Sequence, residues 1–159
     1  MYDRALQALT KLVLEPEWEA RSYPASYGFR PGRSCHDTIE PIFKAIKGKP
    51  KFVLDADIAK CFDRIDHEAL LIKLNTSPTI RRQIRAWLKS GVMDKEQLFP
   101  TSEGTPQGGV ISPLLANIAL HGMEERIKQF AETLKGQKQK NCKALSLIRY
   151  ADDFVIHSR

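Results

Sequence analysis

Cysteine is scarce in this sequence, and no stretch is both long and apolar enough to cross a membrane. The three cysteines, Cys35, Cys61 and Cys142, are far apart and form no C-x-x-C pair. Their number and spacing favour neither a disulfide framework nor a zinc site, and they fit a reducing compartment, so we expect a cytoplasmic protein. The longest uncharged stretch, residues 104–123, is interrupted by proline, glycine and polar residues. We therefore expect no membrane span and no signal peptide.

Acidic residues are fewer than basic ones. Lys and Arg total 25 against 19 Asp and Glu, which gives a net charge of +6 over 159 residues. This balance favours a polyanionic partner such as nucleic acid, although many basic proteins bind none. A helix expected at residues 79–90 has a basic side, which is either a solvated face or a nucleic-acid contact. The hydrophobic content of 42% is enough for one core, so we expect one domain or a fragment of a larger one.

Apolar spacing and turn residues predict the order of helices and strands. Residues 5–14 have helical spacing that ends at Pro16, and a Gly- and Pro-rich loop follows. Ser34 and Asp37 resemble the capping box that starts a helix, which should run to about residue 46. The remaining expected elements are a strand (51–58), two helices (66–74, capped by Asp66, and 79–90), a short strand (97–102), a helix (113–130, with Ser112 as N-cap), a polar basic loop (135–141) and two strands (144–150 and 154–158).

Carboxylates are found at the ends of two of the expected strands. Apolar and polar residues alternate along residues 51–58, which places Asp55 and Asp57 on one face. The stretch RYADDFVI places Asp152 and Asp153 side by side between two apolar runs, where like charges repel. Such a pair is often simple turn chemistry at a hairpin tip. If the two strands pair, however, Asp57 and Asp152 converge and become oxygen ligands for one or two magnesium ions, as in two-metal phosphoryl transfer.

The chain contains four segments, SYGFRPGRS, DADIAKCFDRIDH, GTPQGGVISPLLANI and RYADDFVI, whose order and spacing resemble the reverse transcriptases encoded by group II introns. The resemblance spans nearly the whole chain. It implies an α+β fold, namely a right-hand polymerase palm with an antiparallel sheet backed by helices and part of the fingers. It also implies RNA-directed DNA synthesis linked to intron splicing and retrohoming. The implied domains are partial fingers at residues 1–50 and an incomplete palm at residues 51–159.

The resemblance also implies a metal site. Asp57 resembles the first metal ligand, with Ile58 contributing its backbone carbonyl, and Asp152 resembles the ligand from the hairpin, with Asp153 beside it. The implied catalytic residues are Asp57, Asp152 and Asp153. The implied cofactor is a pair of Mg²⁺ ions, for which Mn²⁺ can substitute.

Substrate-binding roles follow from the same motifs. Arg30 resembles the fingers arginine that holds the nucleotide triphosphate. Phe62 resembles the bulky residue beneath the sugar that excludes a ribose 2′-hydroxyl, although an ordinary core aromatic is an open alternative. Gln107 and Gly108 resemble the turn that touches the templating base. The implied substrate-binding residues are Arg30, Ile58, Phe62, Gln107, Gly108, Tyr150 and Ala151.

The implied partners are an RNA template, a DNA primer, deoxynucleotide triphosphates and group II intron RNA, with no membrane. The family has a further fingers segment upstream of these motifs and a thumb downstream of them. We expect this chain to lack both, together with any endonuclease domain, so the isolated fragment should be inactive. Two alternatives are a truncated RNA-binding remnant that cannot polymerise, and the reverse transcriptase of a CRISPR-associated or retron system.

Overall fold

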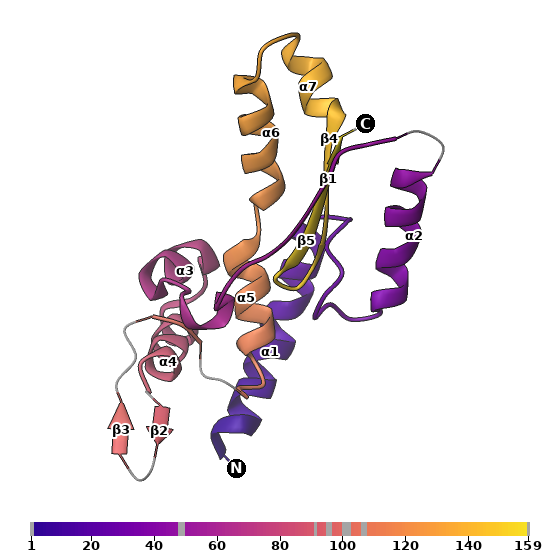
Figure 1. The fold of residues 1–159 in the computed structure, drawn as a ribbon. Helices are drawn as coiled ribbons and strands as arrows, with labels where there is room; N and C mark the ends of the chain where they lie inside the picture. Colours follow the sequence, from indigo (N-terminus) through magenta and orange to yellow (C-terminus); the bar gives the residue numbers. More distant parts are fainter. Residues whose placement is uncertain are drawn as a thin grey trace. The chain divides into compact units, whose positions relative to one another are not determined.

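The computed structural model describes residues 2–47, 50–90, 92–94, 97–99, 103–105 and 108–158 (Figure 1). They form two units: unit 1 contains Met1–Arg21 and Ala59–Ala119, and unit 2 contains Ser22–Ile58 and Leu120–Arg159. Each unit is therefore built from two separate stretches of sequence. The expected boundary between fingers and palm at residue 50 lies within a stretch of unit 2 and stays a prediction.

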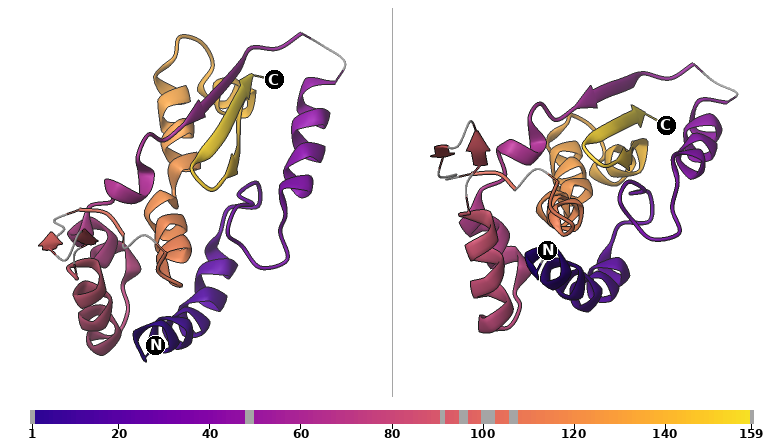
Figure 2. Two further views of the ribbon diagram at one scale, coloured as in Figure 1. Left: turned by 60° about the horizontal axis from the view of Figure 1, so that its bottom comes forward. Right: turned by 90° about the horizontal axis from the view of Figure 1, so that it is seen from below.

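Unit 1 consists mainly of helices. Its elements are α1 (Tyr2–Arg21), α3 (His67–Leu74), α4 (Pro78–Leu88), most of α5 (Ser112–Leu120), the 3-10 turn η1 (Cys61–Asp63) and a hairpin of β2 (Val92–Asp94) and β3 (Gln97–Phe99). Helices α3 and α4 lie side by side (Figure 2). Leucine, isoleucine and tryptophan side chains form one buried core, which includes Leu14, Trp18, Leu71, Ile84 and Leu115. No helix in the described stretches combines the length and the apolar character that a membrane span requires.

Helix α1 continues past Pro16, where the sequence predicted its end. Proline inside a helix removes one backbone donor and clashes with the preceding turn. Leu14 and Trp18, on either side of Pro16, are 2% and 4% exposed and belong to the core of unit 1. Burying a large apolar side chain contributes about 1.5 to 3 kcal/mol, so packing at two such positions offsets the proline. The predicted end at Pro16 is therefore wrong.

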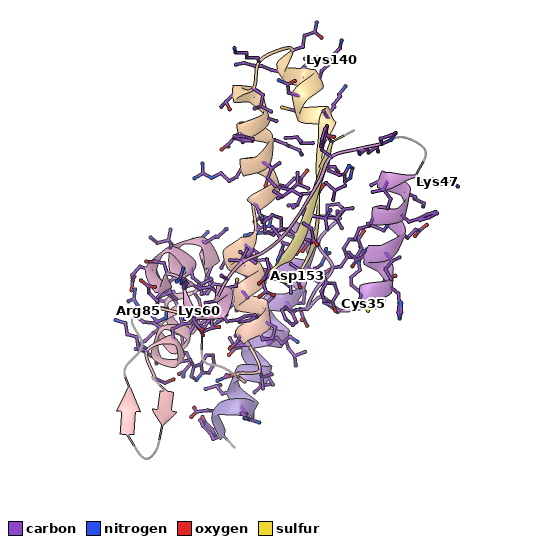
Figure 3. All side chains as sticks on the ribbon, in the orientation of Figure 1. Cys35, Lys47, Lys60, Arg85, Lys140 and Asp153 are labelled. Carbon is purple, nitrogen blue, oxygen red and sulfur yellow. The ribbon has the colours of Figure 1, made fainter. Side chains whose placement is uncertain are left out.

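The starts of α3 and α4 agree with the sequence. Asp66 accepts a hydrogen bond from the backbone N–H of Ala69 at 2.6 Å and caps α3, as expected. Helix α4 begins with Pro78 in its first turn, where the missing N–H has no cost. On the basic side of α4, Arg85 (labelled in Figure 3) forms an ion pair with Glu68 at 2.7 Å. Part of this basic side therefore contacts the protein itself.

The helix expected at residues 113–130 is two helices. Helix α5 ends before a turn at Gly122, and α6 (Met123–Thr133) begins after it. Gly122 has a φ of +86°, a left-handed conformation that glycine adopts without steric cost and that ends helices. The prediction of one continuous helix is therefore wrong. Ser112, expected as the N-cap, is the first residue of α5.

Unit 2 contains a three-stranded antiparallel sheet in the order β1-β5-β4. Its strands are β1 (Val53–Asp57), β4 (Leu145–Tyr150) and β5 (Asp153–Ser158), and its helices are α2 (Cys35–Ile46), α6 and α7 (Lys138–Ala144). All three helices pack against β4, and α6 also packs against α7 (Figure 1). Strand β1 lies at one edge of the sheet. The result is a small antiparallel sheet with helices against it, which is the expected architecture.

Helices α2 and α7 differ in how well the sequence predicts them. At the start of α2, the backbone N–H and the hydroxyl of Ser34 donate to Asp37 at 2.7 and 2.8 Å, which agrees with the expected capping box. Helix α7 instead occupies part of the stretch predicted as a polar loop. Lysine, glutamine and alanine favour a helix, and the Asn141 side chain donates to the Leu134 carbonyl at 3.0 Å. The loop prediction is wrong because α7 is stabilised by packing against α6 rather than by an apolar pattern of its own.

Candidate active site

The aspartates of β1 and β5 lie opposite each other at one end of the sheet. In the register of these strands Asp57 pairs with Asp153, and Asp153 also pairs with Tyr150 on β4. Directly opposed residues of antiparallel strands share a face of the sheet, so these three residues form one row. Figure 3 labels Asp153 at this hairpin end. The pairing of the two carboxylate-bearing strands, on which the predicted site depends, is confirmed.

Asp152 lies in the turn between β4 and β5, next to the end of β1. The turn consists of Ala151 and Asp152, and Ala151 has a φ of +57°, which is uncommon for a residue other than glycine. The backbone N–H of Ile58 donates to the carbonyl oxygen of Asp152 at 3.3 Å, so the chain leaving β1 reaches the turn itself. Ala151 is buried, Asp152 is half-buried, and Asp57 and Asp153 are exposed. Hydrogen-bonded main chain thus holds carboxylates that solvent can reach.

The carboxylates at this end of the sheet repel one another. Loss of some solvation, followed by the negative charges of Asp57, Asp152 and Asp55, raises the pKa of the exposed Asp153 carboxyl above its ordinary value. A divalent cation would offset this repulsion, and carboxylate oxygens are the ligands that magnesium prefers. Among the described residues, no group of three or more His, Cys, Asp or Glu side chains is placed to hold a metal ion. The donor chemistry fits a magnesium ion bound by one or two carboxylates, with other oxygens completing its coordination.

A loop before α2 runs alongside the hairpin. The backbone N–H of Tyr27 donates to the Arg149 carbonyl, and the N–H of Arg149 donates to the Ala25 carbonyl, both at 2.9 Å. Gly28 follows, and a Cβ added to it would lie 2.2 Å from the backbone nitrogen of Ala151. Only glycine allows this approach. Gly28 was not among the predicted site residues, and its position in the motif SYGFRPGRS was the only signal that could have indicated it.

Two arginines bond the main chain near the turn. Arg149 is 5% exposed, and its Nη1 donates to the carbonyl of Ala151 at 2.7 Å. Nη1 of Arg30 donates to the carbonyls of Tyr23 at 2.9 Å and Ser26 at 2.5 Å. In this structure Arg30, the predicted triphosphate ligand, therefore stabilises its own loop through that nitrogen. Sequence reasoning missed Arg149, whose only signal was a charged residue within an apolar strand pattern.

The other predicted substrate residues belong to unit 1. Phe62 lies on η1, is half-buried and packs against the core, while its backbone carbonyl accepts from the N–H of Thr105 at 2.7 Å. Gly108 is exposed, has a φ of +76° and has no described neighbour within 4 Å of an added Cβ. Gln107 lies outside the described residues. The first residues of the GTPQGG motif, Gly104 and Thr105, hydrogen-bond to the backbone of Ile65 and Phe62.

A hairpin with two adjacent aspartates, paired with a strand that carries two more, is the arrangement expected of a polymerase palm. The sequence profile described as reverse transcriptase (RNA-dependent DNA polymerase) matches residues 1–159. The chain therefore belongs to the reverse transcriptase family.

Curated relatives include proteins encoded by group II introns. The chain is 38% identical over 130 residues to the group II intron-encoded protein LtrA of Lactococcus lactis subsp. cremoris, which covers 80% of this chain and 22% of LtrA. It is also 38% identical over 138 residues to an uncharacterised 91 kDa protein in the cob intron of Schizosaccharomyces pombe, covering 85% and 16%. Protein YkfC of Escherichia coli is 30% identical, covering 97% and 48%. The resemblance to group II intron proteins is confirmed, and the chain spans less than half the length of each of these relatives.

Solved structures confirm the fold class. A partial Cas6-RT-Cas1–Cas2 complex contains a chain that is 32% identical, with a TM-score of 0.53 over 99% of this chain and 26% of that one. Telomerase from Candida albicans, solved with a fragment of telomeric RNA, has a TM-score of 0.63 at 18% identity over 98% and 30%. The second similarity shows the fold alone. An α+β fold of the reverse transcriptase type is therefore confirmed.

Proposed function

We propose that this chain provides the catalytic core for RNA-directed DNA synthesis in a group II intron-encoded protein. The observation that carries the proposal is the pairing of Asp57 with Asp153, beside the turn that contains Asp152. Carboxylates that meet at one point would hold divalent ions, and such ions would stabilise the attacking and leaving oxygens of nucleotidyl transfer. The opposition of Asp57 and Asp153 in the strand register supports this role.

In this proposal Asp57, Asp152 and Asp153 act as the metal-binding carboxylates, and the backbone carbonyl of Ile58 assists them. When bound, two Mg²⁺ ions, for which Mn²⁺ can substitute, would supply electrostatic stabilisation of an in-line displacement at phosphorus. The chain's own contribution is to hold the carboxylates in place. Strand pairing holds Asp57 against Asp153, and the bond from Ile58 to Asp152 holds the turn.

Substrate binding is assigned to the remaining motif residues. Phe62 would pack beneath the sugar of the incoming nucleotide and exclude a 2′-hydroxyl. The guanidinium of Arg30 would bind the triphosphate, because its planar fork matches phosphate oxygens. Gln107 and Gly108 would contact the templating base, because an exposed glycine with a positive φ allows close approach of its backbone. Tyr150 and Ala151 would line the site, since Tyr150 pairs with Asp153 on one face.

The proposed partners are an RNA template, a DNA primer, deoxynucleotide triphosphates and group II intron RNA. The identity to LtrA supports the intron assignment, and the sparse cysteines support a cytoplasmic location. The 32% identity to a chain of the Cas6-RT-Cas1–Cas2 complex favours a CRISPR-associated reverse transcriptase as the second candidate. Co-purification of the complete natural protein with intron RNA, rather than with Cas1 and Cas2, would favour the first candidate.

Primer extension on an RNA template tests the proposal. In the complete natural protein that contains these residues, Asp57→Ala or Asp152→Ala should lower extension by at least about two to three orders of magnitude, because each removes transition-state stabilisation. RNA binding should survive and weaken with salt, because it rests mainly on Lys and Arg contacts to phosphates. Asp37→Ala is the matched control, since it removes a carboxylate of the same unit at the start of α2. Because it also weakens the capping box, extension is compared at a temperature at which every variant is folded. Normal extension by the Asp152→Ala variant would show that the catalytic assignment is wrong.

A further inference from the structure

In unit 1, the main chain of the GTPQGG motif is bonded to the turn that carries Phe62. The N–H of Gly104 donates to the Ile65 carbonyl at 2.8 Å, and the N–H of Thr105 donates to the Phe62 carbonyl at 2.7 Å. An isolated antiparallel bridge joins Glu103 to the residue that caps α3. These bonds place the first residues of the motif against η1.

His67 adds a side-chain bond to this junction. It is the first residue of α3 and is 4% exposed, and its Nε2 lies 2.6 Å from the carbonyl oxygen of Gly104. Because a carbonyl can only accept, Nε2 carries the hydrogen. Within the described residues Nδ1 of His67 is buried and has no hydrogen-bond partner. A buried polar atom without a partner is costly, so an apolar residue would suit this position better if packing were its only purpose.

Gly104 packs closely against the backbone of the turn that carries Phe62. A Cβ added to Gly104 would lie 2.8 Å from the carbonyl oxygens of both Phe62 and Asp63. The distance between Gly104 and the Phe62 turn is therefore set in two ways. Close packing against the Phe62 and Asp63 carbonyls limits it on one side, and the His67 hydrogen bond to Gly104 limits it on the other.

We propose that His67 is a positioning residue for nucleotide selection. Through its hydrogen bond to the Gly104 carbonyl, His67 would hold the turn that carries Phe62 against the first residues of the GTPQGG motif. The Phe62 ring would then keep the position from which it excludes a ribose 2′-hydroxyl. This inference rests on the proposed role of Phe62. It assigns to His67 no contact with the substrate.

The test compares kcat/KM for ribonucleotides and deoxynucleotides on one primer and template, in the complete natural protein. His67→Leu should raise the ratio of ribonucleotide to deoxynucleotide kcat/KM by about threefold to tenfold, the range expected when one hydrogen bond is lost. His67→Gln should restore the wild-type ratio, because the glutamine amide can donate at nearly the same reach. A purely structural role would lower kcat/KM for both nucleotides equally and leave their ratio unchanged.

A matched glycine pair tests the junction without changing His67. Gly104→Ala should raise the ratio as His67→Leu does. Gly122→Ala should leave the ratio unchanged, because an added Cβ there meets only a side-chain atom, at 3.7 Å. The two glycines have almost the same φ, +86° for Gly122 and +88° for Gly104, so backbone strain is matched between the variants. If His67→Leu does not fold, as shown by loss of its thermal transition, this glycine pair decides the question. Equal ratios for Gly104→Ala and Gly122→Ala would then refute the proposal.

A double-mutant cycle separates failure of this inference from failure of the proposed function. Phe62→Ala should raise the ratio by itself, and adding His67→Leu should raise it no further, because the residue on which His67 acts is already gone. If the wild type extends a primer and Phe62→Ala raises the ratio, but His67→Leu alone does not, the positioning role is wrong and the proposed function stands. If the wild type extends no primer, the proposed function fails, and this inference fails with it.

Discussion

Gly28 lies against the turn of Ala151 and Asp152 between β4 and β5, so Gly28→Ala tests how the candidate site is held in place. An added Cβ would lie 2.2 Å from the nitrogen, 2.8 Å from Cα and 2.9 Å from Cβ of Ala151. Carbon and nitrogen atoms pack at about 3.5 Å, so the loop and the turn must separate by about 1.3 Å along the shortest contact. Gly28 is not among the residues with positive φ, so its backbone accepts alanine and the contact alone produces the effect.

The expected consequences concern both stability and catalysis. Overpacking of this kind costs about 1 to 3 kcal/mol, which in a domain of this size lowers the melting temperature by about 2 to 12 °C. A displacement of about 1 Å at a catalytic group costs about 100-fold in rate. We therefore expect Gly28→Ala to lower primer extension by about 100-fold, because Ala151 precedes Asp152 in the turn.

Gly32→Ala is the matched control, measured by thermal unfolding and primer extension in parallel. Gly32 lies in the same loop with a φ of +68°, and no described atom lies within 4 Å of an added Cβ. This variant should lose about 1 to 2 kcal/mol through backbone strain while keeping most of its extension activity. Wild-type activity in Gly28→Ala, or equal losses of activity in both variants, would refute the idea that the loop holds the turn.

Three further predictions concern metal, sugar selection and pH. Millimolar Mg²⁺ or Mn²⁺ should raise the melting temperature of this chain by offsetting carboxylate repulsion, and an equal shift in Asp152→Asn would contradict the metal site. Phe62→Ala should admit ribonucleotides while largely keeping deoxynucleotide incorporation, which assays of both nucleotides on one template will check. Hydrogen bonds from the hydroxyl and the N–H of Ser34 lower the pKa of Asp37, so its charge stabilises the fold above the unfolded pKa, and this stabilisation is lost as pH falls through the folded pKa. Asp37→Asn should therefore melt earlier than the wild type at pH 7, with a difference that shrinks below about pH 4, and a pH-independent difference would count against this assignment.

Sequence alone determined the features that depend on near neighbours in the chain. The capping box of Ser34 with Asp37 and the cap of α3 by Asp66 involve residues three positions apart. The alternation in β1 and the two apolar runs around Asp152 depend on a period of two. These patterns predicted the strands themselves and an aspartate at the end of each, whereas the pairing of the two strands, which sets Asp57 opposite Asp153, is a feature of the tertiary structure.

Tertiary structure decided what depends on contacts between distant residues. Burial of Trp18 stabilises the part of α1 that follows Pro16. Packing against α6 stabilises α7, a lysine-rich helix that has no apolar pattern of its own. Gly28 contacts Ala151, and His67 bonds Gly104, across long separations in sequence. No local period or cap encodes such an approach, because it depends on how close two backbones come after the core has formed. A glycine or a buried histidine is marked in the sequence only by its identity, and its role becomes visible when its distant neighbour is known.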